Sequence, residues 1–173
     1  IDYGPAIEYL NYSTGQTIMD QRTTYSNGVE LNNWDFSHKG AMTLRTALVY
    51  SRNTTALQTF KAVGETNIKS FLNNLDIQIK NDGQDYLVES NSIGADISPI
   101  KMAAAYATFG NYGTYSKPYT LTKVTTRDGQ VTEFKPEQKQ AMKDSTAYMI
   151  TDVLKDSFKY GFATQAAIPG LPT

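Results

Sequence analysis

The chain has 173 residues, a net charge of −1 and 40% hydrophobic residues, which is enough length and apolar content for one domain with a buried core. The absence of cysteine excludes thiol catalysis, disulfides and cysteine-ligated metals, and the single histidine, His38, excludes a metal site built from several histidines of this chain. Lysine and arginine are scattered singly, which argues against a nucleic-acid partner, and no apolar stretch approaches the roughly 20 residues that cross a bilayer.

Residues 1–40 are predicted to be irregular and rich in turns. Turn signals occur at Gly4-Pro5, Thr14-Gly15 and Asn27-Gly28. One short strand is predicted over residues 17–19. Long loops in compact domains are usually functional, so this stretch is expected to contribute to a site.

Helical periodicity begins in the next segment. A helix is predicted over residues 42–50, with Thr43 as its N-cap and apolar residues on one face. After a break at residues 51–53, apolar residues at helical spacing predict a second helix, which Gly64 ends. A further apolar stripe over residues 68–75 predicts a third helix.

The second half of the chain changes character twice. Residues 76–97 are polar and predicted to be mostly loop, with a turn at Asp82-Gly83. Ser98 and Pro99 then begin a helix, as its cap and first-turn proline, and Gly110 ends it. The alanine-rich centre of this helix predicts the close packing that the central helix of a bundle has.

The last part of the chain is predicted to form a hairpin and a helix. The period changes over residues 114–134, which indicates a β-hairpin around the tight turn Asp128-Gly129. A helix is predicted from about Asp144 to Gly161, and residues 168–172 are expected to be extended because they contain proline and glycine. The whole pattern predicts a mainly helical α+β fold with a small β-hairpin.

The triplet Ser51-Arg52-Asn53 lies at the junction of two predicted helices. On local pattern alone it reads as a helix stop with a cap, because serine and asparagine favour such positions.

A longer resemblance supplies a second interpretation of this triplet. Four segments resemble, in the same order, the class A penicillin-binding proteins, which are bifunctional murein synthases with Ser-x-Asn as the second active-site motif of their transpeptidase domain. These segments are Asp-Tyr-Gly-Pro-Ala-Ile-Glu at 2–8, the stretch from Asn33-Trp34-Asp35 to Ser51-Arg52-Asn53-Thr54-Thr55-Ala56-Leu57, the stretch 98–115 and the stretch 141–149.

The resemblance implies that residues 1–173 are the central portion of a single penicillin-binding transpeptidase domain, with the serine penicillin-binding/β-lactamase-like fold. In that family the Ser-x-x-Lys motif would precede Ile1, and the Lys-Thr-Gly motif would follow Thr173. The segment from Ser98 to Lys101 also fits Ser-x-x-Lys, but it follows Ser-x-Asn, which reverses the order of the family. It is therefore interpreted as a helix start.

The resemblance also implies roles for individual residues. The Ser51 hydroxyl would bridge the lysines of the two flanking motifs and pass a proton to the leaving amine, and the Asn53 amide would hold a carbonyl of the acyl donor and help orient the first lysine. Arg52, the variable middle residue, is expected to face solvent or to form a salt bridge. Trp34 is a candidate substrate-binding residue of the cleft, with a core or satellite-cluster tryptophan as the alternative.

Three further residues are expected to have no catalytic role. His38 lies in a polar loop and is expected at the solvated surface. Tyr106 and Phe109 lie on the alanine-rich helix and are expected in the core.

By resemblance, the parent protein is a bacterial serine D,D-transpeptidase of cell-wall peptidoglycan biosynthesis, anchored in the membrane with this domain on the extracytoplasmic face. Its partners would be peptidoglycan stem peptides, β-lactam antibiotics and the missing flanking segments of the same domain, and no metal or organic cofactor is implied. This chain alone is expected to be inactive. The alternatives are a non-catalytic fragment or binding module of the same fold, and a serine β-lactamase or β-lactam sensor, against which the length of the class A resemblance argues.

Overall fold

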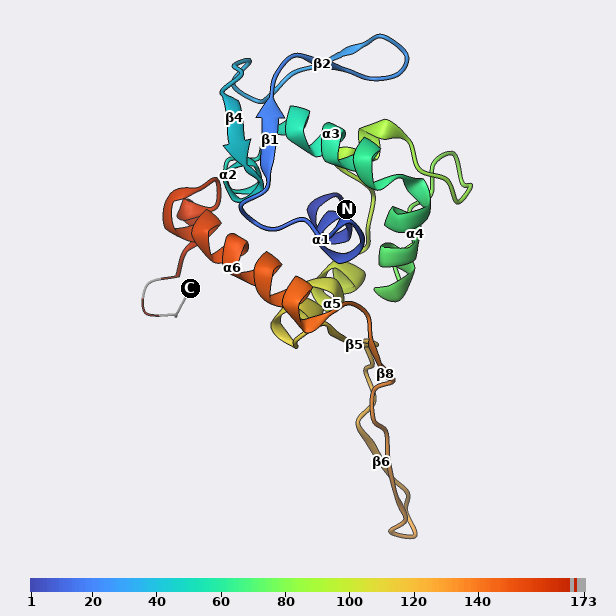
Figure 1. Cartoon of the computed structure of the whole chain (residues 1–173). Helices are drawn as coiled ribbons and strands as arrows, with labels where there is room; N and C mark the ends of the chain where they lie inside the picture. The colour runs from blue at the N-terminus through green and yellow to red at the C-terminus, as the bar shows by residue number, and fades with distance from the viewer. Residues whose placement is uncertain (169, 171–173) are drawn as a thin grey trace.

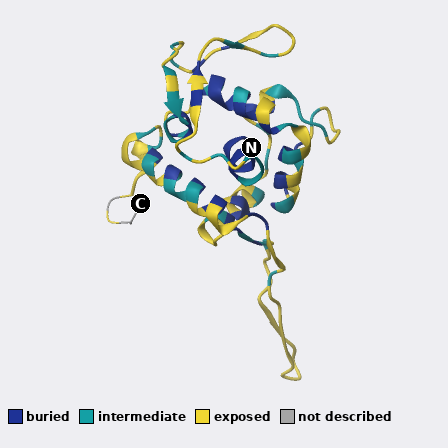
Figure 2. Ribbon diagram, in the orientation of Figure 1, coloured by how far each residue is buried: buried dark blue, intermediate teal, exposed yellow. Residues whose placement is uncertain are grey.

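The computed structural model describes residues 1–168 and 170, and it places one helix at the centre of the others (Figure 1). This helix, α1 (Tyr3–Leu10), packs against α3 (Asn53–Val63), α4 (Glu65–Asn74) and α6 (Asp144–Tyr160). Its first five residues are all buried, as the dark blue ribbon in Figure 2 shows. The centre of the fold is therefore formed by a segment for which no helix was predicted.

The prediction of irregular structure over residues 1–40 is wrong at α1, because Gly4 and Pro5 serve a helix instead of a turn. Proline is tolerated in the first turn of a helix, where its missing N–H has no intrahelical bond to lose. Gly4 lies against α4, and a Cβ atom at this position would come within 2.9 Å of the Phe71 ring. Glycine is therefore what lets α1 and α4 approach each other closely.

Two short antiparallel ribbons follow α1. Strand β1 (Thr17–Asp20) pairs with β4 (Gly40–Thr43), and β2 (Thr23–Thr24) pairs with β3 (Glu30–Leu31). The strand predicted at residues 17–19 is thus confirmed. Side chains alternate along β1, so that Asp20 points inward and is buried.

The helices predicted after β4 are confirmed. In α2 (Leu44–Val49) the Thr43 hydroxyl accepts a hydrogen bond from the Thr46 amide at 3.1 Å, as expected of an N-cap. Gly64 ends α3 and precedes α4. The loop after α4 contains the predicted turn at Asp82-Gly83, where both residues have positive φ, and a short 3-10 helix, η1 (Glu89–Ser92).

Helix α5 (Pro99–Gly110) begins and ends where it was predicted, but it is not the central helix of the fold. Its buried residues are Ala104, Ala105 and Thr108, whereas Tyr106 is 55% exposed. The assignment of Tyr106 to the core is therefore wrong. Phe109 is partly buried against both apolar clusters of the core.

The hairpin is confirmed and is longer than predicted. Strands β5 (Thr114–Ser116) and β8 (Gln138–Gln140) form its base, and β6 (Lys123–Thr125) and β7 (Val131–Glu133) form its outer part. It extends away from the helical body as a narrow arm (Figure 1). The turn lies at Asp128-Gly129, where Gly129 has φ 85°.

Helix α6 ends at Tyr160 and is followed by a short 3-10 helix, η2 (Thr164–Ala166). The extended tail predicted over residues 168–172 falls largely outside the described residues. The Glu8 carboxylate ties α1 to the start of α6, because it accepts hydrogen bonds from the Lys143 amide at 3.1 Å and from the Thr146 hydroxyl at 2.6 Å. Within the described residues, no helix combines the length and the apolar character needed to cross a bilayer.

Candidate functional site

The junction between α2 and α3 holds Ser51 in a left-handed backbone conformation, with φ 51°. The Ser51 amide donates to the Leu48 carbonyl at 3.1 Å, and the Arg52 amide donates to the Ala47 carbonyl at 3.0 Å. This pair of hydrogen bonds is a Schellman motif, in which glycine commonly occupies the left-handed position. A serine therefore stands where the backbone favours glycine, and its side chain is exposed.

Asn53 is the first residue of α3 and is half-buried. Its side-chain amide donates a hydrogen bond to the Asn32 carbonyl at 2.9 Å. This bond uses one of the two amide hydrogens and leaves the carbonyl oxygen of the side chain available as an acceptor. This bond fixes Asn53, two residues after Ser51, to the loop that precedes β4.

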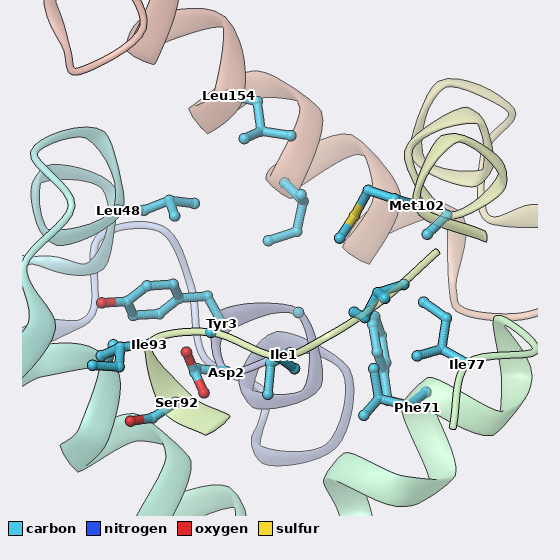
Figure 3. Close-up of a pocket in the computed structure, with 18 of the residues that line it drawn as sticks. Ile1, Asp2, Tyr3, Leu48, Phe71, Ile77, Ser92, Ile93, Met102 and Leu154 are labelled. Carbon is cyan, nitrogen blue, oxygen red and sulfur yellow. The ribbon is translucent and has the colours of Figure 1, made fainter. Parts of the chain in front are cut away.

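Ser51 and Asn53 line the same cavity, which has a volume of about 440 Å³. Its walls come from the start of α1, the junction between α2 and α3, α4 and the loop after it, residues 92–97, α5 and one side of α6 (Figure 3). The cavity wall is mostly apolar, and its polar groups are few. Apolar side chains of the wall include Leu48, Ile93, Met102, Phe109, Ile150 and Leu154.

A buried carboxyl group, that of Asp2, lines this cavity as well (Figure 3). Asp2 is 7% exposed, and its Oδ1 atom has no hydrogen-bond partner among the described residues; the same holds for the buried Ser92 hydroxyl on the cavity wall. Burial raises the pKa of the Asp2 carboxyl to about 7. The carboxyl group of Asp2 therefore changes its protonation near neutral pH, within a mostly apolar wall.

We expect Asp2→Asn to stabilise the protein at pH 8 and to change its stability little at pH 4. Between about pH 4 and 7 the folded state binds a proton at Asp2 that the unfolded state has released, so the free energy of unfolding falls by about 1.4 kcal/mol for each pH unit. Asparagine removes this dependence. Urea unfolding of both proteins at the two pH values measures the effect, with Asp96→Asn at the surface as the control; an equal difference at both pH values would contradict the assignment.

Trp34 lies outside the cavity that contains Ser51 and Asn53. Its side chain is 56% exposed, its Nε1 donates to the Tyr50 carbonyl at 3.2 Å, and its ring meets Phe162 edge to face at 5.5 Å. Trp34 lines a neighbouring cavity of about 430 Å³ instead. The core position is therefore wrong, the alternative of a satellite cluster stays open because the ring packs on Phe162, and contact of Trp34 with substrate stays a prediction.

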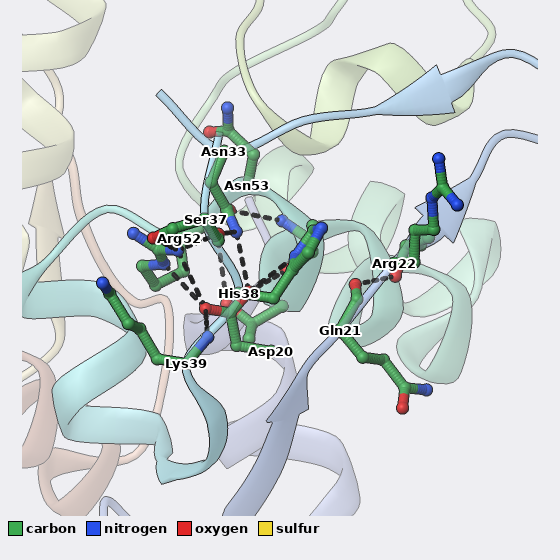
Figure 4. A network of polar contacts seen from close by, with 12 residues as sticks. Asp20, Gln21, Arg22, Asn33, Ser37, His38, Lys39, Arg52 and Asn53 are labelled. Atoms are coloured by element: carbon green, nitrogen blue, oxygen red, sulfur yellow. Dashed lines mark hydrogen bonds and ion pairs between the residues drawn. The ribbon is translucent and has the colours of Figure 1, made fainter. Parts of the chain in front are cut away.

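A buried polar network lies under the junction and centres on Asp20 (Figure 4). One carboxylate oxygen accepts from the Asn33 side chain at 2.7 Å and from the Thr54 hydroxyl at 2.6 Å. The other accepts from the Lys39 amide at 2.9 Å and from the Arg52 side chain at 2.9 Å. The network joins the end of β1, the loop before β4 and the start of α3 into one unit.

Arg52 is 3% exposed, so the alternative that it faces solvent is wrong and the alternative of a salt bridge is confirmed. Besides Asp20, its guanidinium pairs with Asp35 at 3.0 Å. Arg52 is therefore held between two carboxylates.

His38, expected at the solvated surface, has a 30% exposed side chain whose Nδ1 lies 3.8 Å from the nearer Asp20 oxygen.

Both carboxylates of this network have lowered pKa values. Burial acts to raise the pKa of Asp20, but the hydrogen bonds that it accepts, led by the one from Thr54, and the charge of Arg52 hold this pKa below its ordinary value. The hydrogen bond from Arg52, followed by that from Ser37, holds the pKa of Asp35 well below its usual range. Both groups therefore remain charged beside Arg52 at neutral pH.

Comparison with known proteins identifies the fold and the family. Residues 4–172 match the family described as the penicillin binding protein transpeptidase domain. The chain belongs to this family. It is 40% identical over 99% of its length to penicillin-binding protein 1A/1B of Bacillus subtilis and, over the same share, to penicillin-binding protein 1A of Streptococcus pneumoniae. The chain covers 19% and 25% of these two relatives, and the resemblance to class A penicillin-binding proteins is confirmed.

Solved structures of penicillin-binding transpeptidase domains have the same fold. The D,D-transpeptidase domain of a peptidoglycan glycosyltransferase from Eggerthella lenta aligns with a TM-score of 0.83 at 18% identity, over 98% of this chain and 49% of that chain. Penicillin-binding protein A of Mycobacterium tuberculosis, solved as an imipenem acyl-enzyme complex, aligns with a TM-score of 0.81 at 18% identity, over 98% and 44% of the two chains. The predicted fold class is therefore confirmed.

The sequence predicted a Ser-x-Asn motif, which stays a prediction, but the buried network beneath it was missed. Asp20 and Arg52 are separated by 32 residues, and no local pattern relates them. The one available signal was the alternation of β1, which places an acidic residue at an inward position. A buried carboxylate requires partners, so this alternation could have suggested that a cation lies nearby.

Proposed function

We propose that this chain is the central portion of the transpeptidase domain of a serine D,D-transpeptidase, which cross-links peptidoglycan by acyl transfer. The observation that carries the proposal is the placement of Ser51 and Asn53 on the wall of one apolar cavity, at a helix junction of a chain that belongs to this family. Stem peptides ending in D-Ala-D-Ala are the acyl donors, and β-lactam antibiotics acylate the same nucleophile in their place.

The proposed reaction needs a nucleophilic serine with a base, which the Ser-x-x-Lys motif of a preceding segment supplies. The serine oxygen attacks the carbonyl carbon of the D-Ala-D-Ala bond, D-alanine leaves with a proton, and an acceptor amine then displaces the serine from the acyl group. Ser51 relays the proton to the leaving amine. The Asn53 amide holds a carbonyl oxygen of the donor and orients the lysine of the first motif.

The position of this domain in its parent protein is part of the same proposal. Residues 1–173 form the middle of one transpeptidase domain, whose flanking segments carry the other two motifs and pack against the cavity described here. The parent protein is anchored in the bacterial cytoplasmic membrane and carries this domain on the extracytoplasmic face. The supporting observation is the 40% identity to penicillin-binding proteins 1A/1B and 1A over 99% of the chain.

The alternative nucleophile motif from Ser98 to Lys101 has a structural role. Ser98 precedes α5 as its N-cap residue, and Pro99 occupies the first turn of the helix. Neither Ser98 nor Lys101 is among the residues that line the cavity of Ser51 and Asn53. This placement favours the transpeptidase proposal, in which the nucleophile belongs to a segment before Ile1, over a self-contained β-lactamase or β-lactam sensor.

Labelling with a fluorescent penicillin tests the proposal. We expect the parent protein to form a covalent adduct and residues 1–173 alone to form none, because the serine and lysine of the first motif are not among them. Ser98→Ala in the parent protein serves as the control and should label normally. A stable adduct on any serine of residues 1–173, located by mass spectrometry of peptides, would falsify the assignment of this chain as a fragment without the nucleophile.

A further inference from the structure

The conformation of Ser51 requires an explanation, because a non-glycine residue in the left-handed region costs roughly 1–2 kcal/mol relative to a right-handed one. Ser51 has φ 51° and lies between two helices, where a relaxed backbone would extend or shift α2. Such residues persist when surrounding structure holds them, and they are concentrated at functional sites. Besides the hydrogen bond from its own amide to the Leu48 carbonyl, Ser51 is held through the next residue, Arg52.

The main chain of Arg52 is fixed to both helices. Its amide donates to the Ala47 carbonyl at 3.0 Å and so closes the Schellman motif of α2. Its carbonyl accepts the Ala56 amide at 3.2 Å and the Thr55 hydroxyl at 2.8 Å, and so begins α3. Ser51 therefore lies directly before a residue whose main chain is hydrogen-bonded to both α2 and α3.

The side chain of Arg52 is fixed as firmly as its main chain. Its guanidinium contacts Asp20 at 2.9 Å, Asp35 at 3.0 Å and the carbonyl oxygen of Ser37 (Figure 4). Arg52 is 3% exposed, and these partners come from β1 and from the loop before β4. The acceptors on several sides fix the orientation of the planar guanidinium. A lysine or a neutral side chain lacks this planar set of donors and would not be fixed in the same way.

We propose that Arg52 is a positioning residue of the transpeptidase site, and that its pairing with Asp20 and Asp35 holds Ser51 in the left-handed conformation that presents its hydroxyl to the cavity. This inference rests on the proposed function of Ser51. It assigns to the middle residue of the Ser-x-Asn motif a role that the motif itself does not specify. Arg52 also lines this cavity, but its guanidinium is engaged by Asp20, Asp35 and the carbonyl of Ser37, and it acts through Ser51.

Acylation kinetics of the parent protein with a labelled penicillin test this inference. For Arg52→Gln we expect the rate constant of acylation at saturating penicillin to fall about tenfold, with a small change in the dissociation constant of the initial complex, because Ser51 is misplaced while the cavity remains. Arg52→Gln leaves Asp20 as a buried charge without its cation, so this variant can fail to fold. Asp35→Asn keeps the pair with Asp20 and is expected to lower the same rate constant severalfold in a folded protein.

A second arginine of the chain provides a matched control. Arg45 on α2 pairs with two carboxylates of α6, Asp152 and Asp156, and it is not among the residues that line the cavity of Ser51. Arg45→Gln therefore also removes two ion pairs, although these are more exposed than those of Arg52, and we expect it to lower the melting temperature while the acylation rate constant stays normal. A lowered rate constant in all three variants would show that loss of stability alone explains the effect.

Two further outcomes separate this inference from the proposed function. If Asp35→Asn, and Arg52→Gln where it folds, acylate at the normal rate while Ser51→Ala does not, then Ser51 acts without help from this network and the inference is wrong. If Ser51→Ala itself acylates normally, the proposed function fails first.

Discussion

Replacement of Ser51 by alanine in the parent protein should lower the rate of penicillin acylation by about 10²–10³ and leave the protein folded. Loss of one polar group that acts in the transition state typically has this effect, which equals roughly 3–4 kcal/mol. Ser51 lines the cavity with an exposed side chain, so its hydroxyl can reach a bound acyl donor without rearrangement of the core. Asn53→Ala is expected to have an effect in the same range. Stopped-flow or gel-based labelling with a fluorescent penicillin measures both rates.

Ser51→Gly is the matched control for this experiment, because the structure predicts opposite effects on stability and activity. Glycine adopts a left-handed backbone readily, so at φ 51° it should raise the free energy of unfolding by up to about 1 kcal/mol. Acylation should be lost as in Ser51→Ala. Near-normal acylation by both variants would show that Ser51 only ends α2, as the local pattern alone suggests.

Asp20→Ala should destabilise the protein by about 3–5 kcal/mol, because it leaves Arg52 as a buried charge that has lost one of its two carboxylate partners. The substitution also removes the acceptor of the Thr54 hydroxyl and of the Asn33 side chain. Thermal or urea unfolding measures the loss, and Asp96→Ala at the surface is the control. A loss below about 1 kcal/mol would show that the network contributes little to the fold.

The same variant has a defined dependence on pH. The pKa of Asp20 is lower in the folded protein than its unfolded value of about 3.9, so its contribution to stability is present above that pH and is lost as the pH falls through the folded pKa. The unfolding free energies of the original protein and of Asp20→Ala should therefore approach each other below about pH 4. A constant difference down to pH 2 would contradict a charged Asp20.

The elements with a clear period were predictable, and those defined by tertiary contacts were not. The helices after β4 follow from apolar spacing with local signals at both ends, such as Thr43 and Gly64, so their positions agree with the structure. Helix α1 was missed because glycine and proline at its start resemble a turn, and only the contact of Gly4 with Phe71 shows why they occur in a helix. The position of Tyr106 failed for the related reason that an alanine-rich helix can pack on one face only.

In the candidate site, too, the residues of a local motif were predictable, and the surroundings formed by tertiary contacts were not. Ser51 and Asn53 were found through a motif whose residues are adjacent in sequence, and the structure places both on one cavity. The burial of Arg52 depends on Asp20 and Asp35, which come from two other segments, so the sequence left its environment open. The separate location of Trp34 depends likewise on the packing of Phe162 and on the carbonyl of Tyr50.

The central position of α1 has a consequence for biosynthesis. This helix leaves the ribosome before the rest of the chain, yet Glu8 bonds to Thr146, which follows it by 138 residues. At ordinary rates of translation, on the order of ten seconds pass before α6 can cover α1. During that interval α1 can contact α3 and α4 but not α6, so production of this domain should be more sensitive to chaperones and to translation speed than its final stability would indicate.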